Sequence, residues 1–254
     1  MRYALPESAP LVSIVIPTKD HVETLDACVM SIAENATYAN YEIVLVENNS
    51  EDPETFAHYE ALPERVTAAS DGKGSARVEY WPGEFNYSKI INYGVGCAKG
   101  DYLLLLNNDT EVISPGFIEE MMGYLQRLDA GVVGAKLYFA DHLVQHAGIV
   151  VGVRGALAHA NQDFSSKREG YLARAVRQGN FSAVTGACQM VRRDVFERVG
   201  GYNEEFAVGF NDADFCLRVW EAGYRTIFTP YAELYHYEFT SRGREEASEE
   251  NLRC

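Results

Sequence analysis

The chain has 254 residues, which is enough for one large domain or two small ones. Its 37 acidic residues outnumber 22 basic residues, and the net charge of −15 disfavours nucleic acid as a partner because phosphate binding needs clustered cations. The same charge disfavours binding to anionic lipid by charge alone, so we expect at most peripheral association with a membrane.

The first half of the chain alternates short apolar runs with segments of helical periodicity. The apolar, β-branched runs predict strands at 11–17, 41–47, 77–81 and 101–106. Apolar residues at helical spacing, or a proline at the start, predict helices over 22–32, from Pro53, over 88–97 and over 115–128. Strands that alternate with helices indicate an α/β fold with a mostly parallel sheet.

The second half is less regular. Its apolar segments predict strands at 131–139 and 143–152, one helix at about 212–222, and two short strands at 224–230 and 232–237. The residues from Gly243 onward are polar and have no core-facing stripe, so we expect a surface helix or a linker.

Targeting and redox features are sparse. No run of about 18 apolar residues predicts a transmembrane helix, and the start, MRYALPESAP, does not resemble a signal peptide. The five cysteines are scattered and form no C-x-x-C pair, which is typical of reduced thiols. We therefore expect a cytoplasmic protein, at most at the inner face of the membrane.

Polar residues follow three of the predicted strands, in the segments 17–20, 47–50 and 107–110. Ligands of open parallel sheets bind beyond the carboxyl ends of the strands. The first strand is not followed by G-x-G-x-x-G, and the chain has no P-loop motif, so neither a dinucleotide site nor a P-loop is expected. An acidic strand end is instead suited to a nucleoside diphosphate held through a divalent metal.

Six motifs occur in an order that resembles a known family: VSIVIPTKD, EIVLVENNSED, GDYLLLLNNDTEV, TGACQMVRRDVFERVGGYNEEF, FNDADFCLRVWEAGYR and ELYHYEFTSRG. Over about residues 11–243 the chain resembles the family-two inverting glycosyltransferases, most closely the bacterial members that build surface polysaccharides. The resemblance implies the GT-A fold, in which helices flank a Rossmann-like, mostly parallel sheet and a smaller half binds the acceptor.

The resemblance also implies a domain organisation. One domain would cover residues 1–241, with a nucleotide-binding half at about 11–110 and an acceptor and catalytic half at about 111–241. A polar tail or linker would occupy 242–254.

The resemblance implies a metal site at Asp109 and His236. Asp109 is the last acid of an Asp-x-Asp-like motif, here Asn107-Asn108-Asp109, and the imidazole of His236 favours Mn²⁺ over Mg²⁺. Asn107 replaces an acid, which would weaken metal binding, and Asn108 is suited to hydrogen bonding a ribose or a phosphate. The alternatives are a polar turn at 107–110 and a buried structural histidine.

Other matching positions imply contacts to a UDP- or dTDP-type sugar donor. These positions are Pro17, Thr18, Asp20, Glu47, Asn48, Asn86, Asn92, Asn107, Asn108, Gly186 and Arg242. Helix capping or turn chemistry is the alternative for Asp20 and Glu47, and a solvated tail is the alternative for Arg242.

The resemblance assigns the catalytic base to Asp212, which would take the proton of the acceptor hydroxyl. Asn211, Asp214 and His159 are implied on the acceptor side, where a saccharide or lipid-linked saccharide would bind. A helix N-cap is the structural alternative for Asp212.

Three functions follow from these residues. The first is an inverting, metal-dependent glycosyltransferase of bacterial surface polysaccharide synthesis. The second is a catalytically weak module of a larger glycosyltransferase that binds nucleotide-sugar, motivated by asparagine at positions 48, 107, 108 and 211. The third, a sugar nucleotidyltransferase, is disfavoured because PTKD after the first strand lacks a glycine-rich basic loop.

Overall fold

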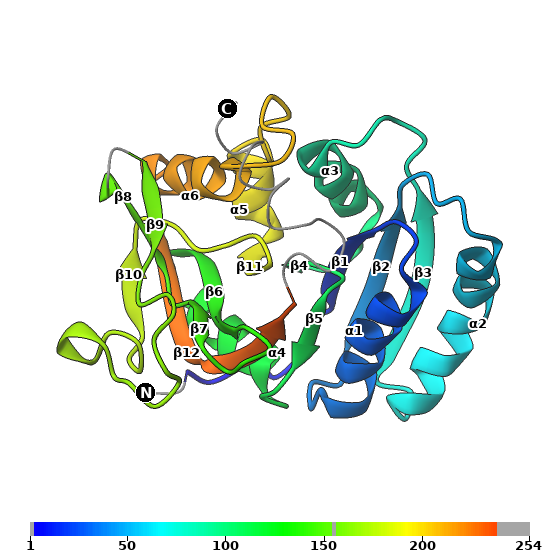
Figure 1. Cartoon of the computed structure of the whole chain (residues 1–254), viewed down its shortest axis with the longest axis horizontal. Helices are drawn as coiled ribbons and strands as arrows, with labels where there is room; N and C mark the ends of the chain where they lie inside the picture. The colour runs from blue at the N-terminus through cyan, green and yellow to red at the C-terminus, as the bar shows by residue number, and fades with distance from the viewer. Residues whose placement is uncertain (1–2, 154–155, 238–254) are drawn as a thin grey trace.

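A mixed ten-stranded sheet forms the centre of the computed structural model, which describes residues 3–153 and 156–237 (Figure 1). The strands of this sheet are β1 (Val12–Thr18), β2 (Tyr41–Glu47), β3 (Gly74–Tyr80), β4 (Tyr102–Leu106), β5 (Thr110–Val112), β6 (Ala130–Tyr138), β7 (Val144–His146), β10 (Gly179–Phe181), β11 (Cys188–Arg192) and β12 (Arg225–His236). A separate hairpin pairs β8 (Ile149–Val151) with β9 (Leu157–His159).

The main path of the sheet has the order β10-β12-β6-β11-β4-β1-β2-β3. The pairs among β1 to β4 are parallel, as are β6 and β12, whereas β11 is antiparallel to both of its neighbours, β4 and β6. Cys188 at the start of β11 therefore pairs with Leu106 at the end of β4. This reversal brings the residues that precede β11 to the carboxyl ends of the parallel strands.

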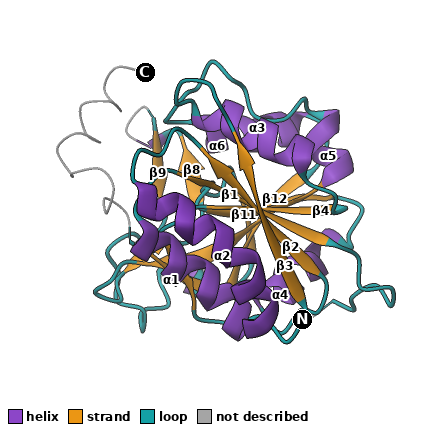
Figure 2. Ribbon diagram, turned by 90° about the vertical axis from the view of Figure 1, so that its right-hand side faces the viewer, coloured by secondary structure: helices purple, strands orange, loops and turns teal. Residues whose placement is uncertain are grey.

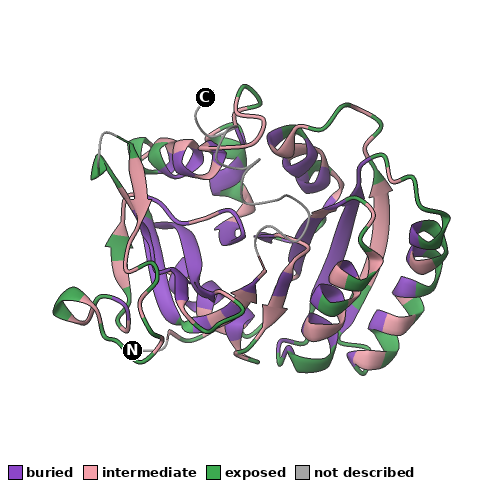
Figure 3. Ribbon diagram, viewed as in Figure 1, coloured by how far each residue is buried: buried purple, intermediate pink, exposed green. Residues whose placement is uncertain are grey.

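Helices cover both faces of the sheet (Figure 2). They are α1 (Val22–Asn35), α2 (Pro53–Ala69), α3 (Tyr87–Cys97), α4 (Phe117–Leu125), α5 (Arg193–Arg198) and α6 (Asn211–Glu221). Ile14 and Ile16 of β1 pack in the cluster that contains α1, α2 and α4, whereas Val15 packs in the cluster that contains α3, α5 and α6. Alternate side chains of a strand face opposite sides, so one apolar run supplies both cores. The buried strands between these layers are visible in Figure 3.

The predicted alternation of strands and helices in the first half of the chain and the mostly parallel pairing of its strands are confirmed. Several observed element boundaries differ from the predicted ones. β3 begins at Gly74 rather than at residue 77. The strand predicted at 143–152 is two strands, because Gly148 at φ 98° turns the chain between them. The two strands predicted at 224–230 and 232–237 are one strand, β12, with an irregular register around Pro230.

The segments that the sequence analysis did not predict are short: β5, β9, β10, β11 and α5 have three to six residues each. Periodicity over so few residues gives little information, and pairing with distant strands decides their conformation. The sheet is also continuous from β3 to β10, and each of the two core clusters contains residues from both predicted halves. In the part of the chain that the structure describes, no helix has the length and hydrophobicity needed to cross a bilayer.

A buried carboxylate ties the amino ends of the strands together. Glu42 is 4 % exposed and accepts hydrogen bonds from Ser13 Oγ at 2.6 Å and from the backbone N–H of Lys99 at 2.6 Å. Arg77 forms an ion pair with its other oxygen. Burial by itself would raise the pKa of Glu42, but these three partners outweigh burial and lower the pKa from its usual 4.5.

We expect Glu42→Gln to lower the free energy of unfolding at neutral pH by about 2 kcal/mol, because the buried side chain would lose its charge-assisted bonds to Ser13, Lys99 and Arg77, while Arg77 keeps Glu79 as a counter-charge. A carboxylate with a lowered folded-state pKa stabilises the fold above its unfolded-state pKa, and this contribution disappears as the pH falls through the folded-state value. Urea unfolding at a series of pH values should therefore show a flatter acid limb in the variant. The matched control is Glu60→Gln on the exposed face of α2, and equal effects of the two substitutions would contradict the prediction.

Candidate active site

The polar strand ends predicted from the sequence meet along one edge of the sheet. Asn108 Nδ2 donates to Thr18 Oγ1 at 3.3 Å, which joins the ends of β4 and β1. The backbone N–H of Asn48 donates to the carbonyl of Thr18 at 3.0 Å, which joins the ends of β2 and β1. On the other side of β4, the backbone N–H of Asn107 donates to the carbonyl of Ala187, just before β11, at 3.1 Å. Four separate segments thus form one polar edge.

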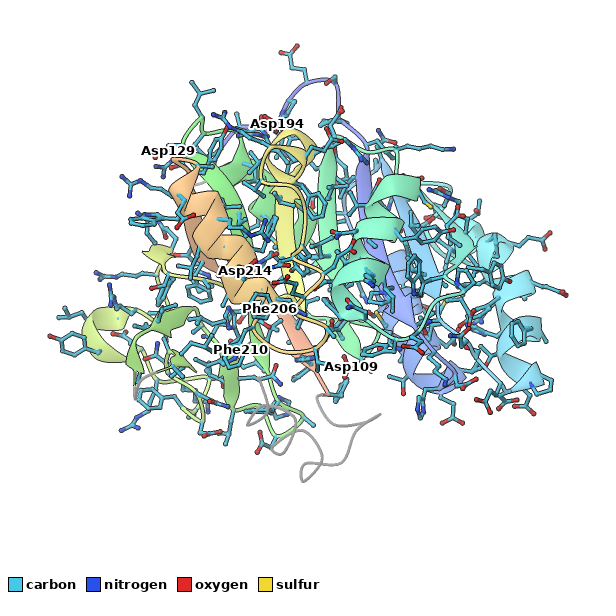
Figure 4. All side chains as sticks on the ribbon, turned by 90° about the horizontal axis from the view of Figure 1, so that it is seen from above. Asp109, Asp129, Asp194, Phe206, Phe210 and Asp214 are labelled. Atoms are coloured by element: carbon cyan, nitrogen blue, oxygen red, sulfur yellow. The ribbon has the colours of Figure 1, made fainter. Side chains whose placement is uncertain are left out.

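Asp109 and His236 lie together at this edge. Asp109 Oδ1 is 3.1 Å from His236 Nε2, and the two side chains are only 12 % and 10 % exposed. The pairing of β5 with the end of β12 brings them together, because His236 lies opposite Thr110 in that register. Figure 4 shows Asp109 on the same side of the molecule as Phe206 and Phe210, close to the N-terminal end of α6.

The chemistry of this pair fits a divalent cation. His236 Nδ1 is 2.7 Å from Gln145 Oε1, which can only accept, so in the neutral ring Nδ1 is protonated and Nε2 has the lone pair. Asn107 Nδ2, 3.2 Å away, donates to that lone pair. Asp109 Oδ1 is buried and accepts no hydrogen bond. A buried anionic oxygen beside an imidazole lone pair is a donor set suited to a metal such as Mn²⁺.

Two protein ligands do not complete a coordination shell. Within residues 3–153 and 156–237 no group of three His, Cys, Asp or Glu side chains is placed to hold a metal. Asn107, where the family pattern has an acid, is hydrogen bonded to His236, and Asn108 is hydrogen bonded to Thr18. The described side chains therefore leave the other positions of the shell to further donors, such as a bound molecule or water.

Asp212 is the second residue of α6, and backbone donors hold both of its carboxylate oxygens. Gly186 N–H donates to Oδ2 at 3.0 Å, and Ala213 N–H donates to Oδ1 at 2.7 Å. A Cβ at Gly186 would lie 3.5 Å from the Cβ of Asp212, so the two segments are in close contact. Each oxygen keeps a further lone pair with which to accept a proton. The segment before β11 thus positions the predicted base.

The neighbours of Asp212 have structural partners. Asn211 Oδ1 accepts from the backbone N–H of Asp212 at 2.8 Å, and its amide donates to the carbonyl of Val208 at 3.0 Å. Asp214 forms an ion pair with Arg218 at 2.8 Å, and Arg218 also donates to the carbonyl of Gly201 at 2.8 Å. Asp214 thus helps to hold the loop before α6, which supports the preference for Asp212 as the base.

Tyr87, which the sequence analysis did not single out, connects the two parts of the site. Its hydroxyl lies 3.2 Å from Asn107 Oδ1 and 3.4 Å from the carbonyl of Gly186. Burial, and then the carboxylates of Asp212 and Asp109, raise the pKa of Tyr87, so the hydroxyl stays protonated and donates. The sequence signal was weak, because a tyrosine at the start of a helix is as readily explained by packing.

We expect Tyr87→Phe to reduce turnover by about ten-fold, because losing one hydrogen bond of about 1 kcal/mol loosens the link between Asn107 and Gly186. The steady-state rate with saturating donor measures this effect. Tyr93→Phe on the same helix is the matched control and should leave the rate unchanged. Equal rates for the two variants would show that the Tyr87 hydroxyl has no such role.

Some of the other predicted nucleotide contacts lie at the polar edge itself, and others bond the turns next to it. Glu47 is 4 % exposed and its carboxylate accepts from the backbone N–H of Ser50. Asp20 Oδ1 accepts from the backbone N–H of Glu51 at 2.9 Å and of Asp52 at 3.1 Å, before α2. Burial would raise the pKa of Asp20, but these bonds outweigh it and lower the pKa. The turn chemistry considered for these two acids is therefore present. Pro17 is half-buried near the end of β1.

Asn86 and Asn92 both bond the loop before α6. Asn86 caps α3 by accepting from Lys89 N–H at 3.0 Å, and its amide donates to the carbonyl of Glu204 at 2.9 Å. Asn92 exchanges two hydrogen bonds of 2.9 Å with the backbone of Tyr202. Both side chains therefore hold the 202–206 loop against α3. A nucleotide contact of either residue stays a prediction.

His159 belongs to a histidine pair near the segment before β11. His146 is fully buried, and its Nε2 accepts from the backbone N–H groups of Gly148 at 3.2 Å and Thr185 at 3.5 Å. Burial, and then His159 and His236, keep the pKa of His146 well below its usual range. The neutral ring donates from Nδ1 to His159 Nδ1 at 3.0 Å. An acceptor-side role of His159 stays a prediction, and Arg242 lies outside the described residues.

The chain is similar in sequence to known glycosyltransferase families. A family described as "Glycosyl transferase family 2" matches residues 13–200, and one described as "N-terminal domain of galactosyltransferase" matches residues 173–240. The chain is 41 % identical to the uncharacterized protein y4gI of Sinorhizobium fredii over 97 % of its own length and 26 % of that protein. It is 37 % identical to the O-antigen biosynthesis protein RfbC of Myxococcus xanthus over 95 % of its own length and 18 % of that protein.

Two solved structures have a similar fold. GalNAc-T7, solved with UDP, GalNAc and Mn²⁺, aligns with a TM-score of 0.71 at 17 % identity over 91 % of this chain and 44 % of that one. The mannosyltransferase PcManGT of Pyrobaculum calidifontis, in complex with GDP-Man and Mn²⁺, aligns with a TM-score of 0.66 at 17 % identity over 94 % of this chain and 59 % of that one. The likeness confirms the predicted GT-A fold.

Proposed function

The chain belongs to glycosyl transferase family 2, and on that premise we propose that it transfers a sugar, with inversion, from a nucleoside diphosphate sugar to a saccharide or lipid-linked saccharide. The observation that supports this most is the position of Asp212, fixed by Gly186 on the same segment that borders Asn107. The O-antigen name of one relative supports a role in bacterial surface polysaccharide synthesis. We propose a UDP- or dTDP-linked donor.

Asp212 performs the proton transfer in this proposal. The acceptor hydroxyl gives its proton to a carboxylate oxygen of Asp212, while the hydroxyl oxygen bonds to the anomeric carbon. The bond between that carbon and the phosphate oxygen breaks, and the nucleoside diphosphate leaves with the electron pair. Backbone bonds from Gly186 and Ala213 hold the carboxylate, so the base keeps one orientation through the reaction.

Asp109 and His236 would hold the metal, with Gln145 fixing the tautomer and orientation of the imidazole. A bound divalent cation would offset the negative charge that develops on the departing diphosphate. Because the described residues offer two protein ligands at this site, we propose that the diphosphate would supply further ligands and that metal and donor bind together. A cation bound in this way would allow a chain of net charge −15 to hold an anionic donor.

The base and ribose of the donor would lie against the ends of β1, β2 and β4. Asn108 is half-buried there, whereas Thr18 and Asn48 are buried, and Asn48 Nδ2 donates to the carbonyl of Gly83 at 3.0 Å, which holds the loop after β3 beside the edge. Glu47, buried behind them, fixes the turn to Ser50.

The test is to incubate the protein with a panel of nucleotide-sugars and candidate acceptors, with Mn²⁺, with Mg²⁺ or with a chelator. Released nucleotide identifies the donor, and the anomeric configuration of the product measured by NMR identifies the stereochemistry. We expect metal-dependent transfer with inversion. Binding of nucleotide-sugar without turnover would favour the catalytically weak module, and retention of configuration would exclude Asp212 as a simple base.

A further inference from the structure

One side of the molecule gathers exposed apolar side chains. Among the described residues, six of the twelve large hydrophobic side chains that are exposed lie on β8 and the loop after it, the loop before β10, and α6, so they are concentrated rather than scattered. These elements lie together at the left of Figure 1. Tyr171, Leu172 and Trp220 are the most exposed of the six, at 77 %, 73 % and 64 %. Such a concentration marks an interaction surface.

The loop before β10, which lies on this side, reverses the charge of the protein. Residues 165–180 contain four basic residues and one acidic residue, whereas the whole chain has 22 basic and 37 acidic residues. Arg174 and Arg177 are exposed and form no ion pair within the described part of the chain. The guanidinium of Arg174 instead lies 5.6 Å from the centre of the Phe181 ring. We call Tyr171, Leu172, Arg174, Arg177 and Trp220 the basic-apolar face.

Two adjoining hollows connect the members of this face. A hollow of about 270 Å³ is lined by Leu172, Arg174 and Arg177, and one of about 460 Å³ is lined by Arg174 and Trp220. Both include Arg174 and Phe181 in their walls, so the two hollows adjoin. An anionic group there would meet guanidinium donors beside aromatic rings.

The apolar tip is held outward by its backbone. Leu172 and Ala173 have φ of 52° and 59°, a conformation that non-glycine residues rarely adopt. Ala175 is fully buried, and its N–H donates to the carbonyl of Glu169 at 2.9 Å, which closes the base of the loop. The strain of two such residues persists only when the surrounding structure maintains it. Tyr171 and Leu172 are therefore presented to solvent by a closed loop.

We propose that the basic-apolar face docks the protein on an anionic phospholipid surface. Tyr171, Leu172 and Trp220 enter the interface between headgroups and acyl chains, where amphipathic aromatic side chains are favoured. Arg174 and Arg177 bind lipid phosphates in the adjoining hollows. The chain as a whole is strongly acidic, and this face offers an anionic membrane two exposed arginines that form no ion pair within the described residues, so binding also favours one orientation. The inference does not depend on the proposed sugar transfer.

The test is flotation of the full chain with vesicles of phosphatidylcholine alone or mixed with phosphatidylglycerol, without donor or metal. We expect binding only to the anionic vesicles, and weaker binding at high salt. The double variant Arg174→Gln/Arg177→Gln should lower the partition coefficient by about thirty-fold, because the loss of each charge alone should lower it by about ten-fold or less. Tyr171→Ser/Leu172→Ser should lower it at least as much.

Matched controls remove the same groups elsewhere. Lys73→Gln/Lys99→Gln removes two exposed charges near β3 and α3, and Leu128→Ser removes a leucine that is 91 % exposed. Both should float like the wild-type protein. Any of three outcomes would overturn the proposal. The control pair and the arginine pair could lose vesicle binding equally, the protein could bind neutral vesicles equally well, or it could bind an acidic oligosaccharide in place of vesicles.

Discussion

Replacing Asp212 with asparagine is expected to lower turnover by about a thousand-fold and to leave the affinity for the donor unchanged. The amide has the size of the carboxylate and can still accept from Gly186 N–H or Ala213 N–H, so the start of α6 keeps its structure. What is lost is the capacity to take a proton. Steady-state rates, together with calorimetric binding of the nucleotide in the presence of Mn²⁺, separate the two effects.

Asp214→Asn is the matched control, since it removes the same charge two residues away. Asp214 is paired with Arg218, so this variant should lose at most about 1 kcal/mol of stability and keep most of its turnover. Near wild-type activity of Asp212→Asn, or a larger loss in Asp214→Asn, would reject Asp212 as the base.

The second large effect is expected at the metal pair. Asp109→Asn should abolish stimulation by Mn²⁺ and reduce transfer by at least about a hundred-fold, because stabilisation of the leaving diphosphate by a cation is worth several kcal/mol. Electron paramagnetic resonance of Mn²⁺, with and without UDP, measures binding directly. We expect wild-type protein to bind the ion weakly alone and more tightly with the nucleotide, because Asp109 and His236 supply only two ligands.

Glu111→Gln removes a nearby acid that pairs with Tyr237 and does not face His236, so it should leave Mn²⁺ affinity unchanged. Gln145→Ala should weaken Mn²⁺ binding by about ten-fold, since His236 would lose the partner that orients it. Unaltered Mn²⁺ affinity in Asp109→Asn would place the metal elsewhere.

The sequence by itself determined the core of the fold. The apolar runs at 11–17, 41–47 and 101–106 are buried parallel strands, because continuous β-branched and leucine runs suit a strand covered on both faces. The polar segments that follow them meet at one edge as predicted, since parallel strands end on the same side. The order of the motifs also indicated the family, and the comparisons confirm it.

Tertiary structure decided how these groups cooperate. Tyr87 meets Gly186 across 99 positions of sequence, and Gln145 meets His236 across 91, and no periodicity encodes such contacts. They exist because β11 runs antiparallel between β4 and β6 and because β12 carries His236 to the end of β5. The net charge of −15 describes the chain as a whole, so it did not exclude a local basic surface. Among the described residues, folding leaves Arg174 and Arg177 without an ion pair beside exposed apolar side chains, because ion pairing depends on which side chains the fold brings together.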